Sequence, residues 1–236
     1  MIPWATPGLA DSCRQWLPEN RYEPIDLLTD GQQDLVSLLD QRQEAIDAVV
    51  IEQDLLDAES REQLVARGLL FPAVLVGEVK GHVDYHPEEL HLAADQLAQL
   101  GYNIDAAISR FLRQCRADGR PEEQGAGAVD RLSQRLQERL GYLGVFYKRD
   151  PSRFLGRLPA EERKELLESL QRTYRDLLIS YFRDPAAANQ ALESFVNTAF
   201  FSDLPITRTV EIHVDLIDGF WKQLRLEGHK NDFLQD

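Results

Sequence analysis

The chain has 236 residues, 43% of them hydrophobic, and a formal net charge of −14 at pH 7. This length and composition allow a sizeable buried core and predict two globular domains. Most of the acidity lies in the first half, since residues 1–120 hold 21 acidic and 10 basic side chains. Phosphate backbones and anionic lipid surfaces would repel so acidic a chain, which argues against a nucleic-acid or membrane partner.

Neither a membrane span nor an export signal is expected. The longest uncharged apolar run, residues 68–77, is about half as long as a membrane-spanning helix requires. The first residues lack the basic and apolar regions of a signal peptide. Cys13 and Cys115 occur without a CxxC pair, so we expect two buried free thiols, with no disulfide framework and no zinc site. These features predict a cytoplasmic protein.

Short apolar or β-branched runs alternate with helical patterns through the first half of the chain. Strands are expected in residues 21–29, 47–52, 71–78 and 88–92, and helices in residues 31–43, 55–68 and 103–116, the last with Asn103 as its N-cap. Such repeats form right-handed parallel crossovers. Residues 1–116 are therefore predicted to be an α/β domain of the receiver-like, flavodoxin-like type. Only residues 1–4 remain for a first strand, which must be nearly absent.

The ends of the expected strands lack the residues of a phosphate-accepting receiver. Such a receiver needs acidic residues that hold magnesium, an aspartate that accepts the phosphoryl group and a lysine, because the magnesium and the lysine neutralise the transferring phosphate. Here Ala5-Thr6-Pro7 follows the first strand, Glu52-Gln53 ends the third and Gly77-Glu78 ends the fourth. We interpret the domain as a pseudo-receiver that senses or docks without accepting phosphate, with Asp54 as the alternative acceptor.

Histidines in the loop before the last expected strand raise the question of a metal site. In an extended segment His82, Asp84 and His86 would share one face, with His91 nearby, and these residue types are common zinc ligands. A glycine and a proline instead mark an irregular surface loop, where histidines often occur without a metal. We therefore predict no bound metal or other cofactor, and keep the metal site as the alternative.

The second half of the chain has a different organisation. Residues 117–128 are rich in glycine, proline and charge and are predicted to be an interdomain linker. Asp150-Pro151 and Asp184-Pro185 each combine a helix N-cap with a proline at the first helical position. Residues 129–236 are therefore predicted to be an antiparallel helical bundle, with a short turn after Pro151 and helices at about residues 129–149, 160–182, 185–201 and 205–227.

The first of these helices carries two stripes on different faces. A core stripe consists of Val129, Leu132, Leu136, Leu140, Leu143 and Tyr147. A basic-aromatic stripe consists of Arg131, Arg135, Arg139, Tyr142, Phe146 and Arg149. Because this region is basic within an acidic protein, it would favour an acidic partner segment. We interpret Arg135, Arg139, Tyr142, Phe146 and Arg149 as a partner-binding surface; the alternative is that solvated arginines cover internal aromatic rings.

The last segment could be a strand or a helix, and its apolar spacing favours a helix. A strand would bring Glu211, His213 and Asp215 together as ligands, whereas a helix places the two acids opposite the histidine. The predicted core stripe of the helix is Ile206, Val210, Ile217, Trp221 and Leu224. We therefore expect no three-ligand site, and we assign His213, Phe220 and Trp221 to a packing or dimer-interface edge.

Two long strings of the second half resemble the KaiA family of cyanobacterial circadian clock proteins. They are RLQERLGYLGVFYKRDPSRFL (135–155) and FVNTAFFSDLPITRTVEIHVDLID (195–218), within a resemblance that covers residues 131–230. The resemblance implies a homodimeric, non-enzymatic activator whose helical domain binds the C-terminal tail of the clock ATPase KaiC and raises KaiC autophosphorylation. It also implies capture by KaiB in the opposite phase, and sensing of oxidised quinones.

Two features depart from the family pattern. The first strand is almost absent and the linker is short, which argues against quinone sensing. The chain ends at NDFLQD, where the family continues with one further long helix. We therefore expect exposed apolar faces on the last helices and weaker dimerisation. The alternative function is a receiver-type phosphorelay adaptor, or a signalling input domain coupled to a dimerisation bundle. An enzyme is not expected, since GxSxG and HExxH motifs are missing from the sequence.

Overall fold

The computed structural model describes residues 2–4, 7–17, 21–28, 35–117, 127–140 and 148–226. Its first half contains five short parallel strands: β1 (Ile2–Trp4), β2 (Asp26–Leu28), β3 (Val49–Glu52), β4 (Ala73–Val76) and β5 (Leu90–Leu92). β1 pairs with β2, and β4 pairs with both β3 and β5. The described strands thus form a two-stranded sheet, β1-β2, and a three-stranded sheet in the order β3-β4-β5, and β1 of the first lies close to β3 of the second. The register places Val50 opposite Val74 and Val74 opposite Leu90.

Helices complete an α/β domain around these strands. They are α1 (Pro7–Gln15), α2 (Leu35–Arg42), α3 (Ala58–Ala66) and α4 (Leu100–Ala117), with 3₁₀ turns η1 (Gln43–Ala45), η2 (Gln53–Leu55) and η3 (Leu97–Gln99). The side chains of β4 and β5 and of residues 49–51 in β3 are buried, as expected for parallel strands covered on both faces. The fold class of this half, an α/β domain, is therefore as predicted.

The starts of two helices in this half were predicted wrongly by three residues: α3 begins at Ala58 and not at residue 55, and α4 begins before residue 103. The last helix of the domain begins at Leu100, so Asn103 lies inside α4 and is not its N-cap. The amide of Asn103 is fully buried and donates to the carbonyl of Gln99 and the hydroxyl of Thr198. Asparagine is a common helix N-cap, but here the Asn103 side chain instead contacts Thr198 in the second half of the chain.

The second half is helical. It contains α5 (Ala128–Leu140), α6 (Ala160–Tyr181), α7 (Pro185–Phe201) and α8 (Ile206–Leu226), with short turns η4 (Pro151–Arg153) and η5 (Leu155–Arg157). Residues 148–150 are not helical, so the predicted extension of the first helix to residue 149 is wrong. Asp184 caps α7 by accepting from the N–H groups of Ala186 and Ala187, as its sequence predicts.

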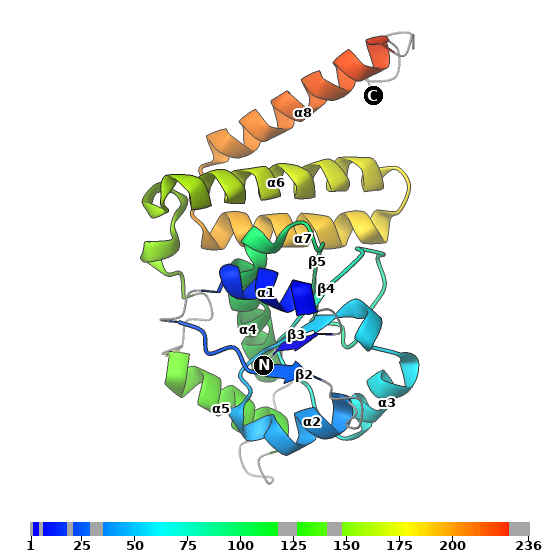
Figure 1. The fold of residues 1–236 in the computed structure, drawn as a ribbon, viewed down its shortest axis with the longest axis vertical. Helices are drawn as coiled ribbons and strands as arrows, with labels where there is room; N and C mark the ends of the chain where they lie inside the picture. The colour runs from blue at the N-terminus through cyan, green and yellow to red at the C-terminus, as the bar shows by residue number, and fades with distance from the viewer. Residues whose placement is uncertain are drawn as a thin grey trace.

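Figure 1 shows how the two halves meet. α6 and α7 lie side by side as an antiparallel pair, and α8 diverges from them at an angle. α7 packs against α4 and β5, and α6 packs against η3. α5 lies apart from the pair and packs on the α/β domain, against α4. In the described residues no helix is long and apolar enough to cross a membrane.

Candidate functional site

The predicted basic-aromatic stripe begins on α5, and there the two stripes separate as expected. Leu132 and Leu136 are buried in the protein core, while Arg131, Arg135 and Arg139 lie on another face. We call these three arginines the basic row. They face residues 43–47, here called the acidic turn, at the end of α2. The basic row is therefore paired within the chain.

Arg149 does not continue the basic row. It lies on the connector, residues 148–158, which contains η4 and η5, and its guanidinium pairs with Asp203 in the turn between α7 and α8. Its guanidinium carbon also lies 4.6 Å from the ring centre of Phe154 and 5.0 Å from that of Phe200. Tyr142 and Phe146 lie outside the described residues. The structure therefore places Arg149 apart from Arg135 and Arg139.

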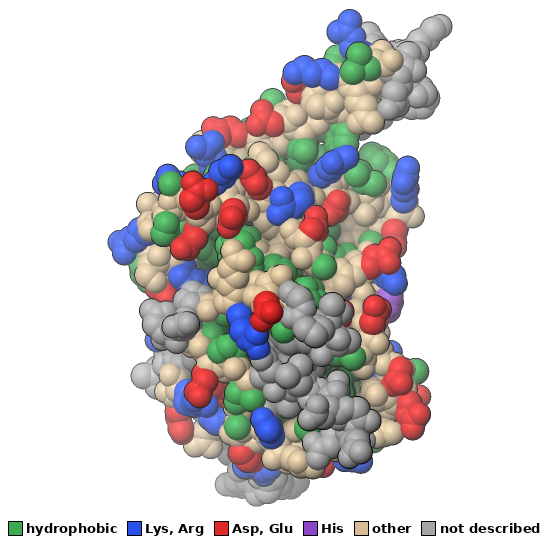
Figure 2. All heavy atoms as spheres, viewed as in Figure 1, with side chains coloured by type: hydrophobic (Ala, Val, Ile, Leu, Met, Phe, Trp, Pro, Cys, Tyr) green, Lys and Arg blue, Asp and Glu red, His purple; other side chains and the backbone are tan. Residues whose placement is uncertain are grey.

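The predicted core stripe of α8 is only partly covered. Ile206 and Val210 are 75% and 54% exposed, whereas Ile217, Trp221 and Leu224 are half-buried. Val214, which is outside that stripe, is 55% exposed, and Ile212 is the buried residue of this helix. The prediction that Ile206 and Val210 belong to the core is thus wrong for the single chain, because α8 diverges from α6 and α7. Figure 2 shows hydrophobic side chains in the angle between α8 and the α6–α7 pair.

The predicted packing edge of α8 is partly covered. His213 is exposed, and its Nδ1 lies 3.3 Å from the hydroxyl of Tyr174, with the two ring centres 5.9 Å apart. Phe220 and Trp221 are half-buried. Glu211 pairs with Arg208 one turn earlier and Asp215 is exposed, so the structure does not build a ligand set around His213.

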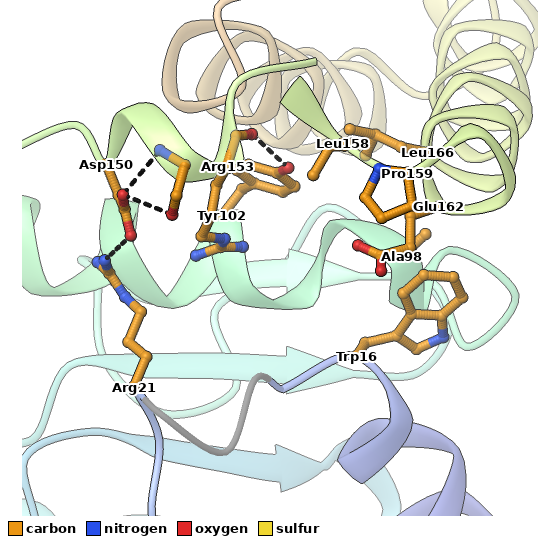
Figure 3. Close-up of a pocket in the computed structure, with 11 residues that line it drawn as sticks. Trp16, Arg21, Ala98, Tyr102, Asp150, Arg153, Leu158, Pro159, Glu162 and Leu166 are labelled. Atoms are coloured by element: carbon orange, nitrogen blue, oxygen red, sulfur yellow. Dashed lines mark hydrogen bonds and ion pairs between the residues drawn. The ribbon is translucent and has the colours of Figure 1, made fainter. Parts of the chain in front are cut away.

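A cavity of about 460 Å³ lies beside the connector, between the α/β domain and the helical half. Figure 3 shows the Arg21 side chain reaching Asp150 on one side of it, and Trp16 and Glu162 on the other. Beside this cavity Asp105 of α4 is buried and accepts from two guanidiniums. Nη2 of Arg21 lies 2.7 Å and Nη1 of Arg153 3.2 Å from its oxygens. Burial raises the pKa of Asp105, and the two guanidiniums oppose that rise.

The connector is held from both sides. The hydroxyl of Tyr102 in α4 donates to the carbonyl of Arg153 at 2.9 Å, and the Arg153 guanidinium lies 4.2 Å from the Tyr102 ring centre. On the other side the N–H of Leu155 donates to the carbonyl of Ser202 at 2.6 Å. The connector thus links α4 to the turn before α8. Sequence reasoning missed this cluster, although an aspartate within the apolar pattern of α4 was a visible signal.

The histidine loop before β5 is organised around Glu89. Its buried carboxylate accepts from the N–H groups of Asp84, Tyr85 and His86, at 2.6, 2.6 and 3.0 Å, and from Nε2 of His91 at 2.8 Å. These hydrogen bonds lower the pKa of Glu89 against the opposing effect of burial. The first role of this carboxylate is therefore to hold the loop in shape.

The three residues of the alternative metal site, His82, Asp84 and His86, do not come together as one ligand set. His82 lies 2.6 Å from a carboxylate oxygen of Asp84, but His86 turns away and binds the carbonyl of Phe71. Asp84, Glu89 and His91 have ligand atoms within 4.8 Å of one another and form the described group that could hold a metal ion. Their donor atoms are already engaged in hydrogen bonds, including one from Gln53 to Asp84.

The remaining candidates lie in separate places. Asp54, the alternative phosphate acceptor, is exposed in η2, and Lys80 pairs with Glu78 at 3.1 Å. Cys13 and Cys115 are both free thiols. Cys13 is fully buried, which raises the pKa of its thiol to about 12, whereas Cys115 is half-buried. The prediction of a buried thiol is thus confirmed for Cys13.

Two protein-family models match the two halves of the chain. The family model "Circadian clock protein KaiA, N-terminal domain" matches residues 2–115, and the model "KaiA C-terminal domain" matches residues 138–236. The circadian clock oscillator protein KaiA of Parasynechococcus marenigrum is 77% identical over 235 residues, which are 98% of this chain and 79% of the relative. The chain belongs to the KaiA family.

Other KaiA proteins are similar over shorter or more divergent stretches. The KaiA of Synechococcus elongatus is 45% identical over 193 residues, or 74% of this chain and 68% of the relative. The KaiA of Acaryochloris marina is 34% identical over 258 residues, or 97% of this chain and 85% of the relative. All three relatives carry the name of a circadian clock oscillator protein.

Proposed function

We propose that this KaiA-family protein is a non-enzymatic clock component that binds the C-terminal tail of KaiC and stimulates KaiC autophosphorylation, with KaiB as its antagonist. The observation that carries the proposal is the match to the family's C-terminal domain over residues 138–236. The protein would act by binding one state of a KaiC segment better than another, which shifts the equilibrium between the two states. No covalent chemistry by this chain is required, and the cytoplasm is the expected location.

The basic row is the proposed binding surface for that tail. Guanidinium groups form strong, directional hydrogen bonds with carboxylates, which suits recognition of an acidic segment. We propose that Arg135 and Arg139 make these contacts; Tyr142 and Phe146, which lie outside the described residues, remain proposed members of this surface, whereas Arg149 lies apart from it and pairs with Asp203. Arg139 supports this reading because its side chain is 56% exposed and its guanidinium is accessible on the surface of α5.

The N-terminal domain is proposed to be a pseudo-receiver that covers residues 1–116, followed by a linker at 117–128 and a helical half at 129–236, whose first helix, α5, packs on the α/β domain and not on the α6–α7 pair. The order β3-β4-β5 in one sheet, with the β1-β2 pair close to β3, supports this proposal, because it is compatible with the order 2-1-3-4-5 of flavodoxin-like folds. The strand ends at Glu52-Gln53 and Gly77-Glu78 provide neither an acceptor aspartate nor a catalytic lysine. A role in docking or sensing fits these residues better than phosphotransfer.

A homodimer formed through the helical half is the proposed assembly. The exposed apolar side chains of α8, Ile206, Val210 and Val214, support it, because a face of this kind on a soluble helix favours burial against a partner. A second copy of the chain is the partner that the family resemblance implies.

The test is to mix the full chain with KaiC and ATP and to follow phosphorylated KaiC over time. We expect more phosphorylated KaiC than in KaiC alone, and a smaller effect after KaiB is added. As a control, the Arg163→Ala variant changes an exposed arginine on α6, away from the basic row, and should raise the amount of phosphorylated KaiC as much as the wild type does. No increase over KaiC alone would reject the proposed function.

A further inference from the structure

Of the two ring nitrogens of His91, only Nε2 is engaged in a hydrogen bond among the described residues. It lies 2.8 Å from Oε1 of Glu89, so Nε2 carries a proton and donates to this carboxylate. In the neutral ring Nδ1 then keeps a lone pair, and it lies 3.8 Å from Oδ2 of Asp84, too far for a hydrogen bond. Two groups that can each give an electron pair to a cation therefore lie next to each other.

Glu89 orients this histidine and is not itself free to bind a cation. Each of its two carboxylate oxygens accepts two hydrogen bonds, three from backbone N–H groups and one from His91. Metal-binding histidines commonly donate their second ring N–H to a carboxylate, which fixes the tautomer and directs the other nitrogen to the metal. Glu89 and His91 have this arrangement, and Nδ1 of His91 is the nitrogen that it leaves for a metal ion.

Asp84 and His82 can supply the other protein ligands. The amide of Gln53 donates to Oδ2 of Asp84 at 2.7 Å, and Oδ1 of the same carboxylate lies 2.6 Å from Nε2 of His82. The Asp84 side chain is largely buried, whereas that of His82 is 51% exposed, so the His82 ring can turn toward an ion from the solvent side. The carboxylate is thus held in place, and the entrance to it is a histidine.

The ligand chemistry favours zinc over magnesium or calcium. Zn²⁺ is bound by histidine nitrogens and carboxylate oxygens at about 2.0–2.2 Å, whereas Mg²⁺ and Ca²⁺ prefer oxygen ligands alone. Two ligands of a tetrahedral zinc ion are about 3.3 Å apart, so Nδ1 of His91 and Oδ2 of Asp84 need to approach by only about 0.5 Å. In the described part of the chain no lysine or arginine pairs with Asp84 or Glu89, so a metal ion would also supply positive charge.

We propose that His82, Asp84 and His91 form a binding site for a divalent transition-metal ion, with Zn²⁺ as the expected ion and water as the fourth ligand. Glu89 is the positioning residue of this site. The set differs from the alternative considered in the sequence, because the His86 ring turns away and His91 takes its place.

A metal ion at this site would act on both halves of the chain. It would tie the exposed part of the histidine loop, at His82, to His91 in β5. The same part of the loop binds α7, because the side chain of Gln190 accepts from the N–H of Gly81 and donates to the carbonyl of His82. The ion would therefore stabilise the contact between the loop and the helical half.

The test uses the full chain without an affinity tag, freed of metal ions by a chelator. Calorimetric titration should show one strong site per chain for Zn²⁺ and none for Mg²⁺. Loss of a residue that only orients a ligand typically lowers metal affinity about 10–100-fold, so Asp84→Asn and His91→Gln, which remove ligands, should each lower it by about 100-fold or more. His82→Gln removes an exposed ligand and should lower it by about 10-fold. Zn²⁺ should also raise the urea midpoint of the wild type.

The matched control is His213→Gln, which removes an exposed histidine on α8 and should bind Zn²⁺ like the wild type. Absence of Zn²⁺ binding by the wild type would overturn the site. Binding that persists in both Asp84→Asn and His91→Gln, or that is lost equally in His213→Gln, would overturn it as well, because the ion would then be held elsewhere on the surface.

Nuclear magnetic resonance of the wild type gives a second measurement that does not depend on how the variants fold. One equivalent of Zn²⁺ should shift the ring nitrogen resonances of His82 and His91 and leave those of His213 unchanged. Shifts at His213 in place of His91 would overturn the site. The spectrum also tests the role of Glu89, since His91 should keep its proton on Nε2 and bind zinc through Nδ1. Zinc on Nε2 would show that Glu89 does not position this ring.

Discussion

Arg153 donates from Nη1 to Oδ2 of Asp105 at 3.2 Å, and this buried ion pair joins the connector of the helical half to α4 of the α/β domain. Asp105 also accepts from Arg21, and Tyr102 fixes the Arg153 backbone. A buried carboxylate is tolerated only where cations and hydrogen-bond donors surround it. The position of the connector relative to α4 is thus fixed by a polar cluster and not by apolar packing alone.

The Arg153→Ala substitution should lower the free energy of unfolding by about 1.5–3 kcal/mol, the range for a hydrogen bond to a charged group. The loss should stay within this range because Arg21 continues to pair with Asp105. Urea unfolding measures it. The control is Arg157→Ala, an exposed arginine in the next turn, which should change stability by less than about 0.5 kcal/mol. Equal effects of the two substitutions would show that the ion pair contributes nothing specific.

Burial favours the neutral form of His86, and the hydrogen bonds of the ring fix which nitrogen carries the proton. Its Nδ1 accepts from the N–H of Glu88 at 3.2 Å, so the proton lies on Nε2, which donates to the carbonyl of Phe71 at 2.7 Å. Burial lowers the pKa of His86 below its ordinary value. The pKa of His86 is therefore lower in the folded than in the unfolded chain. The neutral, buried histidine stabilises the fold fully above its unfolded pKa of about 6.5, and this stabilisation is lost as the pH falls through its folded-state pKa.

The His86→Gln variant should therefore be less stable than the wild type at pH 7.5, and its stability should fall less between pH 7 and pH 5. Glutamine can still donate to the Phe71 carbonyl but does not titrate. Unfolding curves at several pH values provide the comparison, with the exposed His82→Gln as control. A wild-type pH slope in the His86 variant would contradict the assignment of a neutral buried histidine.

Helices with strong local signals were predictable to within about one residue. The segments expected at 160–182, 185–201 and 205–227 appear as Ala160–Tyr181, Pro185–Phe201 and Ile206–Leu226. The apolar spacing that predicts these helices is a local signal, and so is the Asp184-Pro185 cap of α7. Both can be read from neighbouring residues without information from the rest of the chain. The alternation of strands and helices in the first half was predictable for the same reason.

Side-chain roles were less predictable, because they depend on residues distant in sequence. Arg135 lies on the expected face of its helix, but its pairing with Asp47 joins residues 88 positions apart. Periodicity likewise marks Val210 as apolar, but it does not say whether another segment of the same chain covers it. The roles of Glu89 and Asp105 depend on backbone groups and arginines that only the folded chain brings together. Local pattern thus predicts the face on which a residue lies, and tertiary structure determines what it contacts there.

Gly81 combines a left-handed backbone with a close approach to α7. Its φ is +75°, and a Cβ at this position would lie 2.5 Å from the backbone nitrogen of Ala187 and 2.7 Å from the Cβ of Ala186. Its N–H donates to Gln190, whose amide in turn donates to the carbonyl of His82. This glycine therefore allows the histidine loop to pack against the start of α7.

The Gly81→Ala variant should be clearly less stable than the Gly68→Ala variant. Gly68 has a similar φ of +67° but no atom within 4 Å of a built Cβ, so its substitution isolates the backbone cost of about 1–2 kcal/mol. Gly81→Ala adds overpacking against α7, typically a further 1–3 kcal/mol. Denaturant unfolding of the two variants gives the difference directly. Equal losses would mean that the loop moves away from α7 at little cost.

Val214 tests the proposed homodimer. It is 55% exposed and shares one face of α8 with Ile206 and Val210, whereas Asp215 points to the opposite side. In a twofold interface each residue occurs twice, so the Val214 substitution removes two buried valines. Burial of a valine is worth about 1.5 kcal/mol or more, so Val214→Glu should weaken self-association by about 100-fold or more.

Sedimentation velocity over a range of concentrations measures this effect. The wild type should self-associate at micromolar concentration, Val214→Glu should sediment as a monomer, and Asp215→Ala should match the wild type. Both variants should keep the helical content of the wild type, since neither side chain is buried within the chain. Self-association that survives Val214→Glu unchanged would place the interface elsewhere on the helical half, and the exposed valines of α8 would then require another partner.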